Sequence, residues 1–149
     1  MAKHAMWIHG HAVRAQREGY AISKAFLGWG AVYQMNGGEW FHIAIPTPVI
    51  VNSIDMNLQK VFVLYKTSGT SKITSVHLWD GPTKIQAFDG LALSGNHLSQ
   101  IDNSNSWIVN PIHIKWSLGI SVHVDFGPLS QIGVPDITFA SAGADFVTP

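Results

Sequence analysis

Residues 112–126, IHIKWSLGISVHVDF, alternate apolar and polar side chains along their whole length. Every even-numbered position is apolar, and every odd-numbered position is polar or glycine. Because successive side chains of a β-strand point to opposite faces, an alternation of this length predicts a strand that buries one face. A strand this long has to bend, and we expect the bend at Gly119. The fold class that follows is all-β.

Shorter stretches with the same alternation extend this prediction along the chain, at residues 60–67, 73–80, 84–88 and 137–147. Turn sequences separate them: we expect hairpins at NGG (36–38) and SGTS (68–71), and tight turns at DGP (80–82) and DG (89–90). We therefore predict a single domain over residues 1–149. Its expected architecture is a two-layer antiparallel β-sandwich, jelly-roll-like, with about nine or ten strands.

Three segments depart from the alternation. Residues 13–28 have few apolar side chains at helical spacing before Gly19, so we expect a loop with at most a turn of helix. Pro46 and Pro48 cannot donate a backbone hydrogen bond, which predicts an edge strand or a crossover between sheets. Residues 95–106, GNHLSQIDNSNS, form the longest polar stretch and are the expected mobile loop.

The charge balance excludes some partners and favours another. Nine Lys and Arg balance nine Asp and Glu, so no net positive field attracts the phosphates of nucleic acid. Charged residues make up 12% of the chain, against about 25% in a typical soluble domain, and hydrophobic residues reach 46%. This shortage of charge predicts that further copies of the chain cover part of the surface, in a homo-oligomer.

Cysteine is absent, which excludes disulfides, thiolate nucleophiles and cysteine-ligated metal sites. At the start of the chain, His and Gly interrupt the sequence before an apolar signal segment forms. No apolar run approaches the length of a membrane span, about 18 residues or more. We therefore expect a cytoplasmic protein without a membrane partner.

Several strings carry a resemblance to a known family. They are WIHG near the start, FHIAIPTPVIV, VHLWDGPTKIQAFDGLALSG, KWSLGISVHVDFG and ITFASAGADF near the end. Together they span most of the chain, and they resemble an uncharacterised family of small bacterial proteins known only as a domain of unknown function. The resemblance implies a stand-alone all-β unit and supplies no catalytic residues.

Three predicted strands carry a tryptophan and a histidine two positions apart, which puts both side chains on one face. An indole offers flat apolar area and an imidazole can orient hydroxyl groups, so this pair suits a carbohydrate or a small aromatic ligand. Core filling or a subunit interface would also explain the tryptophans. The candidate ligand-binding residues, with the second histidine of WIHGHAV included, are Trp7, His9, His11, Trp40, His42, His77 and Trp79.

The histidines also allow two enzymatic alternatives. His9 and His11 could bind a metal in a jelly-roll enzyme if another strand supplied a third ligand, since a catalytic zinc needs three protein ligands. A histidine in an internal pocket could instead be the general base of a small cyclase, isomerase or lyase that needs no cofactor.

Acidic residues give weaker support to catalysis. Most of them adjoin glycine or a strand end, where Asp is favoured by its own turn hydrogen bonds. Asp125 shares the odd-numbered face with His123, so a His–Asp pair could form there, but no serine has the sequence context of a nucleophile. We predict a non-catalytic module that binds a ligand or self-assembles through its Trp/His face, without cofactor or metal and with no catalytic residue assigned.

Overall fold

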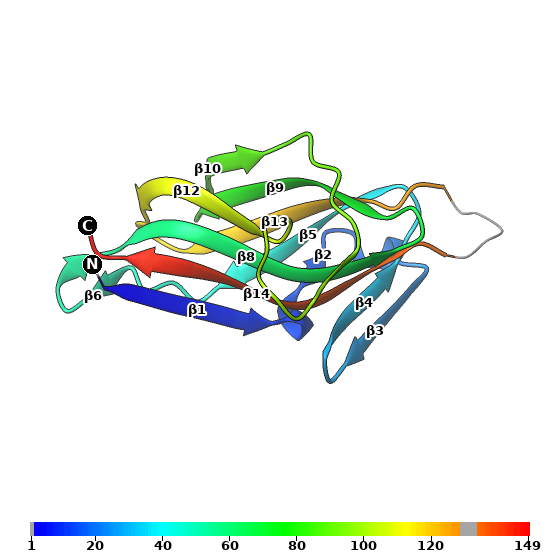
Figure 1. The fold of residues 1–149 in the computed structure, drawn as a ribbon, viewed down its shortest axis with the longest axis horizontal. Helices are drawn as coiled ribbons and strands as arrows, with labels where there is room; N and C mark the ends of the chain where they lie inside the picture. Colours follow the sequence, from blue (N-terminus) through cyan, green and yellow to red (C-terminus); the bar gives the residue numbers. More distant parts are fainter. Residues whose placement is uncertain (1, 129–133) are drawn as a thin grey trace.

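The fold, seen in a computed structural model, consists almost entirely of β-strands (Figure 1). The structure describes residues 2–128 and 134–149. Two short 3-10 turns, η1 (Gly10–Ala12) and η2 (Glu18–Tyr20), lie between the first strands. The strands are β1 (Lys3–His9), β2 (Arg14–Ala15), β3 (Ser23–Leu27), β4 (Gly30–Gln34), β5 (Gly38–Ile45), β6 (Ile50–Val51), β7 (Ile54–Asp55), β8 (Asn57–Ser68), β9 (Lys72–Asp80), β10 (Thr83–Phe88), β11 (Asn96–His97), β12 (Ser106–His113), β13 (Leu118–Asp125) and β14 (Asp136–Val147).

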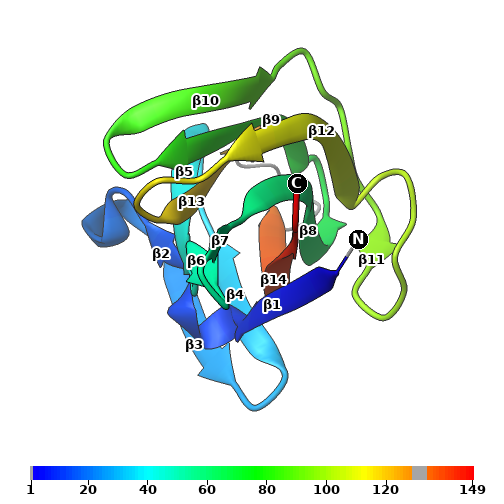
Figure 2. The ribbon, with the colours of Figure 1, turned by 90° about the vertical axis from the view of Figure 1, so that its left-hand side faces the viewer.

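The strands form two large antiparallel sheets, which confirms the predicted all-β class (Figures 1 and 2). The seven-stranded sheet has the order β11-β8-β14-β4-β3, with β1 also paired to β14 and β12 also paired to β8. The five-stranded sheet has the order β10-β9-β13-β5-β2, and β6 and β7 form a small separate pair. The described residues form fourteen strands, and ten of them have five residues or more.

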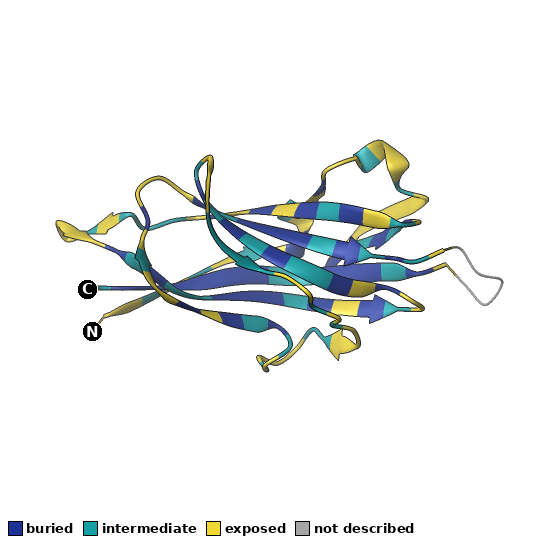
Figure 3. Cartoon of the chain, turned by 90° about the horizontal axis from the view of Figure 1, so that it is seen from above, coloured by how far each residue is buried: buried dark blue, intermediate teal, exposed yellow. Residues whose placement is uncertain are grey.

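The core lies between the inner faces of the two sheets, because the alternation along each strand buries every second side chain (Figure 3). In the five-stranded sheet, Phe41, Ile43 and Ile45 of β5 and Val76 and Leu78 of β9 are nearly inaccessible to water. The long central strands β8 and β14 supply the opposite side of the core. Alternate positions on the five-stranded sheet are therefore left to form its outer face.

The alternating stretch 112–126 is two strands in different sheets, so the prediction of one strand bent at Gly119 is wrong. β12 pairs with β8 in the seven-stranded sheet, and β13 pairs with β9 and β5 in the other. The chain crosses at residues 114–117, where the Asp80 carboxylate accepts hydrogen bonds from the backbone N–H groups of Lys115, Trp116 and Ser117. This cap satisfies donors that lie outside both ladders and leaves the Trp116 side chain exposed.

Two predicted hairpins are also connections between sheets. The NGG turn joins β4 of the seven-stranded sheet to β5 of the five-stranded sheet, and Gly37 bonds to Phe126 and Gly127 instead of closing a hairpin. The SGTS turn likewise joins β8 to β9. The DGP turn is the predicted tight turn, and it joins β9 to β10 as a hairpin. The segment with Pro46 and Pro48 is a crossover between sheets, which was one of the two alternatives predicted for it.

Residues 13–28 form more than the expected loop. They contain η2 and the strands β2 and β3, which lie at the edges of different sheets. All five residues of β3 are exposed, so no alternation marked it in the sequence. The described part of the chain has no helix with the length and apolar character needed to cross a membrane.

We expect the Asp80→Asn substitution to lower the free energy of unfolding by about 2 kcal/mol, because an amide offers one acceptor oxygen to three backbone N–H groups. Burial raises the pKa of Asp80, but the hydrogen bonds from Lys115, Trp116 and Ser117 outweigh it and hold the pKa below its ordinary value. The stabilisation is therefore present above about pH 4 and is lost as the pH falls through the folded-state pKa.

Urea unfolding at pH 7 measures this difference. The matched control is Asp55→Asn on β7, which removes an exposed carboxylate and should change the free energy of unfolding by less than about 0.5 kcal/mol. Equal effects of the two substitutions would show that the Asp80 cap does not hold the crossing.

Candidate functional site

The structure gathers four of the predicted ligand-binding residues on one surface. Trp40 and His42 project from β5 and His77 and Trp79 from β9, on the outer face of the five-stranded sheet. Val76 and Leu78 occupy the buried face of β9, as the sequence predicted. The strand between β5 and β9 is β13, so its outward side chains complete this surface.

The strand register aligns the outward side chains in rows that run across β9, β13 and β5. Trp79 is paired with Gly119 and Gly119 with Ala44, so the first row has a large ring at one end and almost no side chain beyond it. The next row is polar throughout. The three rows are Trp79–Gly119–Ala44, His77–Ser121–His42 and Ser75–His123–Trp40.

Gly119 and Ala44 of the first row form the floor of a hollow of about 420 Å³. Trp79 stands on one side of it, and Ala12 and Arg14 stand on the other, where β2 pairs with β5. The hollow exists because Gly119 carries no side chain and Ala44 carries only a methyl group. Its volume lies within the range of about 300–1,000 Å³ that small-molecule sites occupy.

A smaller hollow of about 210 Å³ adjoins the first. The two share His42, Trp79 and Ser121, and the smaller one adds Gln16, Trp40 and His77. Tryptophan rings and hydroxyl, amide and imidazole groups therefore line the combined depression together. We call the combined depression the Trp79 hollow.

His42 is held in its neutral form at the centre of the Trp79 hollow. Its Nδ1 lies 2.8 Å from Ser121 Oγ and its Nε2 lies 2.8 Å from Gln16 Oε1. A neutral imidazole has one donor and one acceptor nitrogen, and Ser121 can donate to Nδ1 while Nε2–H donates to Gln16. Loss of water around the ring lowers the pKa of His42, and the opposing effect of the Glu39 charge is smaller.

His77 is oriented by an acidic partner. Its Nε2 donates to Asp89 Oδ1 over 2.8 Å, and the same oxygen accepts from Ser75 Oγ. The bond from His77, followed by that from Ser75, lowers the pKa of Asp89. The Trp40 ring lies beside the imidazole of His77, and the two ring centres are 4.7 Å apart.

The His–Asp pair considered at His123 and Asp125 does not form. His123 Nδ1 instead lies 2.6 Å from Thr74 Oγ1, and Asp125 accepts from the backbone N–H of Gly127. Burial lowers the pKa of His123 despite the nearby Asp125 charge. On this surface the acid that pairs with a histidine is Asp89, which follows β10.

The other three predicted residues lie away from this surface. Trp7 is on β1, which pairs with β14 in the seven-stranded sheet, and its ring stacks on Phe62 at a centroid distance of 5.2 Å. Trp7 lies over Gly143, where an added Cβ would come within 2.4 Å of the indole. Because Gly143 has no side chain, the Trp7 ring can pack directly on the backbone of β14, in what we call the Gly143 seat. Trp7 remains 38% exposed.

His9 and His11 contact each other, but they do not share a strand face. The chain turns into η1 at Gly10, His9 Nδ1 accepts from the His11 backbone N–H, and the His11 ring contacts the carbonyl oxygen of Leu27. The ring centres are 4.1 Å apart. Within residues 2–128 and 134–149, no group of three or more His, Asp or Glu side chains is placed to hold a metal ion.

Sequence reasoning missed four residues of the Trp79 hollow and its border. Ser121 was an odd-numbered member of the alternating stretch and could have been assigned to the same face as the histidines. Gln16, Arg14 and Asp89 lie in short or irregular segments, where no periodicity indicated which way they point.

Comparison with known proteins identifies the family. The chain belongs to a family of unknown function (DUF6623), whose family model matches residues 1–137. The match confirms the resemblance to a family of unknown function, and it assigns no role to any residue. No curated protein matches the chain.

We expect Gly143→Ala to lower the free energy of unfolding by about 1–3 kcal/mol, because its methyl group overlaps the Trp7 ring and β14 cannot move away from its neighbours. Combining Gly143→Ala with Trp7→Ala should recover part of that loss, since the overlap then disappears. Denaturant unfolding of the single and double variants gives the coupling.

Gly119→Ala is the matched control, because an added Cβ there is 3.8 Å from the nearest side-chain atom, an ordinary contact. Its effect on unfolding should be small. Additive effects of Gly143→Ala and Trp7→Ala would contradict the seat assigned to Gly143.

Proposed function

We propose that this family member is a non-catalytic binding module that takes a ring-shaped ligand bearing hydroxyl groups in the Trp79 hollow. A carbohydrate is the preferred class, and a small aromatic ligand is the alternative. The observation that carries the proposal is the alignment of the Trp79–Gly119–Ala44 row beside the His77–Ser121–His42 row. The first row places the Trp79 ring beside the space left by Gly119 and Ala44. The second row places polar side chains at the border of that space.

The first row suits the flat apolar face of a sugar. Trp79 is half-buried, so its orientation is restricted by its neighbours before any ligand arrives. An indole has a large apolar face, and stacking a ring against it removes apolar area from water. Gly119 and Ala44 leave the space beside the indole free for that ring.

The second row suits the ligand's hydroxyl groups. His42 and Ser121 are already hydrogen-bonded to each other, which fixes their positions without a ligand. Hydroxyl oxygens and amide groups have further donor or acceptor capacity, so Ser121 and Gln16 can bond a ligand while they hold His42. Arg14 adds a guanidinium donor at the border of the hollow.

A second candidate function rests on His77. Asp89 receives its Nε2–H, which leaves Nδ1 as the nitrogen that could accept a proton from a bound substrate. This arrangement supports a small enzyme of the cyclase, isomerase or lyase type with His77 as general base. Turnover of a bound ligand that is lost in His77→Gln while binding is retained would favour this candidate over the binding module.

We also propose that the chain self-associates through the exposed hairpin of β3 and β4. β3 is an edge strand of the seven-stranded sheet, so one side of its backbone is free to pair. The hairpin and the residues before it expose a group of large apolar side chains: Tyr20, Ile22, Phe26, Leu27 and Trp29. Several large exposed apolar side chains on one edge hairpin support a protein interface at this place.

Trp79→Ala should weaken ligand binding at least about tenfold, which corresponds to about 1.4 kcal/mol, because the stacking wall is lost. The probes are soluble oligosaccharides of glucose, xylose, mannose and N-acetylglucosamine, with indole as the aromatic probe. Titration calorimetry on the wild type identifies the binding class, and the variant is then measured with that probe.

Trp116→Ala is the matched control, since Trp116 is exposed and does not line the Trp79 hollow. It should bind as the wild type does. Wild-type protein that binds none of these probes, or equal losses in both tryptophan variants, would contradict a ligand site at Trp79.

For self-association, Trp29→Glu should convert an oligomer into the 16.3 kDa monomer, because it places a charge in the apolar surface of the hairpin. Light scattering after size exclusion measures the mass. Trp116→Glu, an equally polar change outside the hairpin, should leave the oligomer intact. A monomeric wild type at all accessible concentrations would contradict this proposal.

A further inference from the structure

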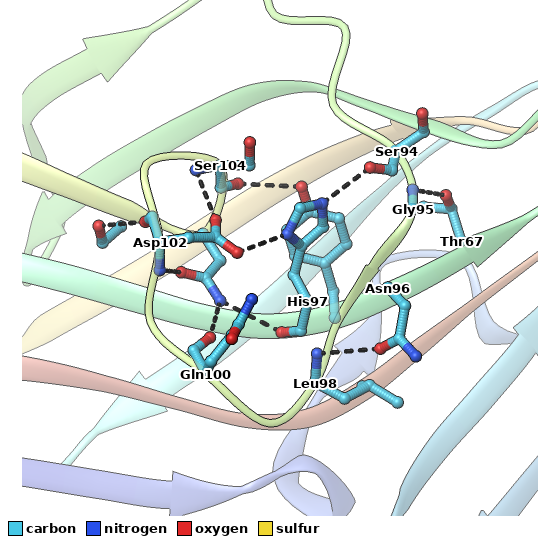
Figure 4. Close-up of polar contacts among 12 residues, drawn as sticks. Thr67, Ser94, Gly95, Asn96, His97, Leu98, Gln100, Asp102 and Ser104 are labelled. Atoms are coloured by element: carbon cyan, nitrogen blue, oxygen red, sulfur yellow. Dashed lines mark hydrogen bonds and ion pairs between the residues drawn. The ribbon is translucent and has the colours of Figure 1, made fainter.

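The segment between β10 and β12, residues 89–105, fastens the two sheets together along one edge. Leu93 bridges to Ile73 of β9 in the five-stranded sheet. Three residues further along, β11 pairs with β8 in the seven-stranded sheet. The sequence predicted a mobile loop over residues 95–106, whereas the structure gives this segment a dense set of hydrogen bonds (Figure 4).

His97 lies at the centre of these bonds, with an acceptor at each ring nitrogen (Figure 4). Nδ1 lies 2.8 Å from Asp102 Oδ2, and Nε2 lies 2.8 Å from the carbonyl oxygen of Ser94. A carboxylate and a carbonyl can only accept, and only the imidazolium carries a hydrogen on both nitrogens. Both contacts can therefore be hydrogen bonds only while His97 is a cation.

The acceptors are held in place by other groups. Asp102 Oδ1 accepts from the backbone N–H of Ser104, so the second oxygen is directed at His97. The fully buried amide of Asn105 donates to the carbonyl oxygens of His97 and Gln100 and accepts from the N–H of Asp102. These bonds fix the carboxylate independently of the imidazole.

The surroundings of His97 contain few other charges. On β8, the Tyr65 ring lies 5.0 Å from the imidazole, and burial raises the pKa of Tyr65 far above its ordinary value, so it is neutral. Lys66 of β8, the register partner of Asn96, is exposed to solvent. Asp102 is the charged group that bonds to His97 within the described residues.

We infer that residues 89–105 form a pH-sensitive strap, closed by the His97 cation between Asp102 and Ser94 and loosened when His97 loses its proton. In the neutral ring, the nitrogen without hydrogen faces an acceptor oxygen, and the two lone pairs repel. The charge-assisted bond to Asp102 is the stronger of the two contacts. The contact with Ser94 is therefore the one that opens. It lies next to the bonds between Gly95 and Thr67 of β8, so its opening weakens the attachment of the strap there.

The direction of the pH effect follows from both partners. Burial lowers the pKa of His97, but the bonds to Asp102 and Ser94 and the Asp102 charge outweigh it and raise the pKa above its ordinary value. The bond from His97 lowers the pKa of Asp102. The strap is therefore closed from about pH 4 up to the raised pKa of His97, and it loosens as the pH rises through that value.

The strap also forms part of a hollow on the seven-stranded sheet. Ser99, Gln100 and Ile101 line a volume of about 420 Å³ together with Trp7 and Leu64. This hollow is separate from the Trp79 hollow and shares no residue with it. Residues 99–101 of the strap line it, so loosening of the strap alters its shape.

Nuclear magnetic resonance tests the proposal on the intact wild-type chain. The His97 ring proton signals should titrate with a midpoint above 6.5, and Asp102→Asn should lower that midpoint, because the carboxylate that favours the cation is removed. Hydrogen-exchange protection factors for the amides of Gly95 and Thr67, which bond to each other's residue beside Ser94, should fall across the same pH range. The fall is about tenfold for each unit by which the pKa of His97 exceeds its ordinary value.

The amides of Ile120 and Val122, in the centre of the five-stranded sheet, are the internal reference and should keep their protection. Asp55→Asn is the matched control variant and should leave the His97 midpoint unchanged. In His97→Gln, protection of the strap should be low at every pH. A wild-type midpoint at or below 6.5, or strap protection that is constant from pH 6 to pH 9, would overturn the proposal.

Discussion

The Asp80 carboxylate, bonded to three successive backbone N–H groups, determines where the chain changes sheets. Without such an acceptor, residues 115–117 would have three partly buried backbone donors that no strand ladder satisfies. Because the crossing is complete before Leu118, β13 enters the five-stranded sheet between β9 and β5. The position of every outward side chain on that sheet depends on this arrangement.

The candidate site follows from the register that the crossing establishes. A shift of one residue in β13 would exchange its buried and exposed faces, and it would replace Gly119 and Ser121 on the surface with large apolar side chains. The core residues Ile120 and Val122 prevent such a shift, because they are buried with Phe41 and Leu78. Core packing therefore keeps a bare floor beside Trp79 and a hydroxyl beside His42.

The sequence was sufficient to predict which side chains of a strand are buried, but not which strand it pairs with. The alternation in β9 and β13 identified the outer faces correctly, and the same reasoning joined 112–126 into one strand, because a period of two contains no information about the partner sheet. The turn at Gly37 was recognised from its residues, yet its bonds to Phe126 and Gly127 are non-local. For the same reason, Trp7 matched the pattern of Trp40 and Trp79 but lies on the other sheet.

Two histidines show how far a site can be assigned from residue type. His42 faces a hydroxyl and an amide, which can both adapt to a neutral ring, so its two bonds require no charge. His97 faces a carboxylate and a carbonyl, which can only accept, so its two bonds require the cation. The partners of His97 lie three and five positions away in the sequence, whereas Ser121 is 79 positions from His42. The bonds that each imidazole can make therefore depend on how the fold places its acceptors and donors, and residue type alone does not determine them.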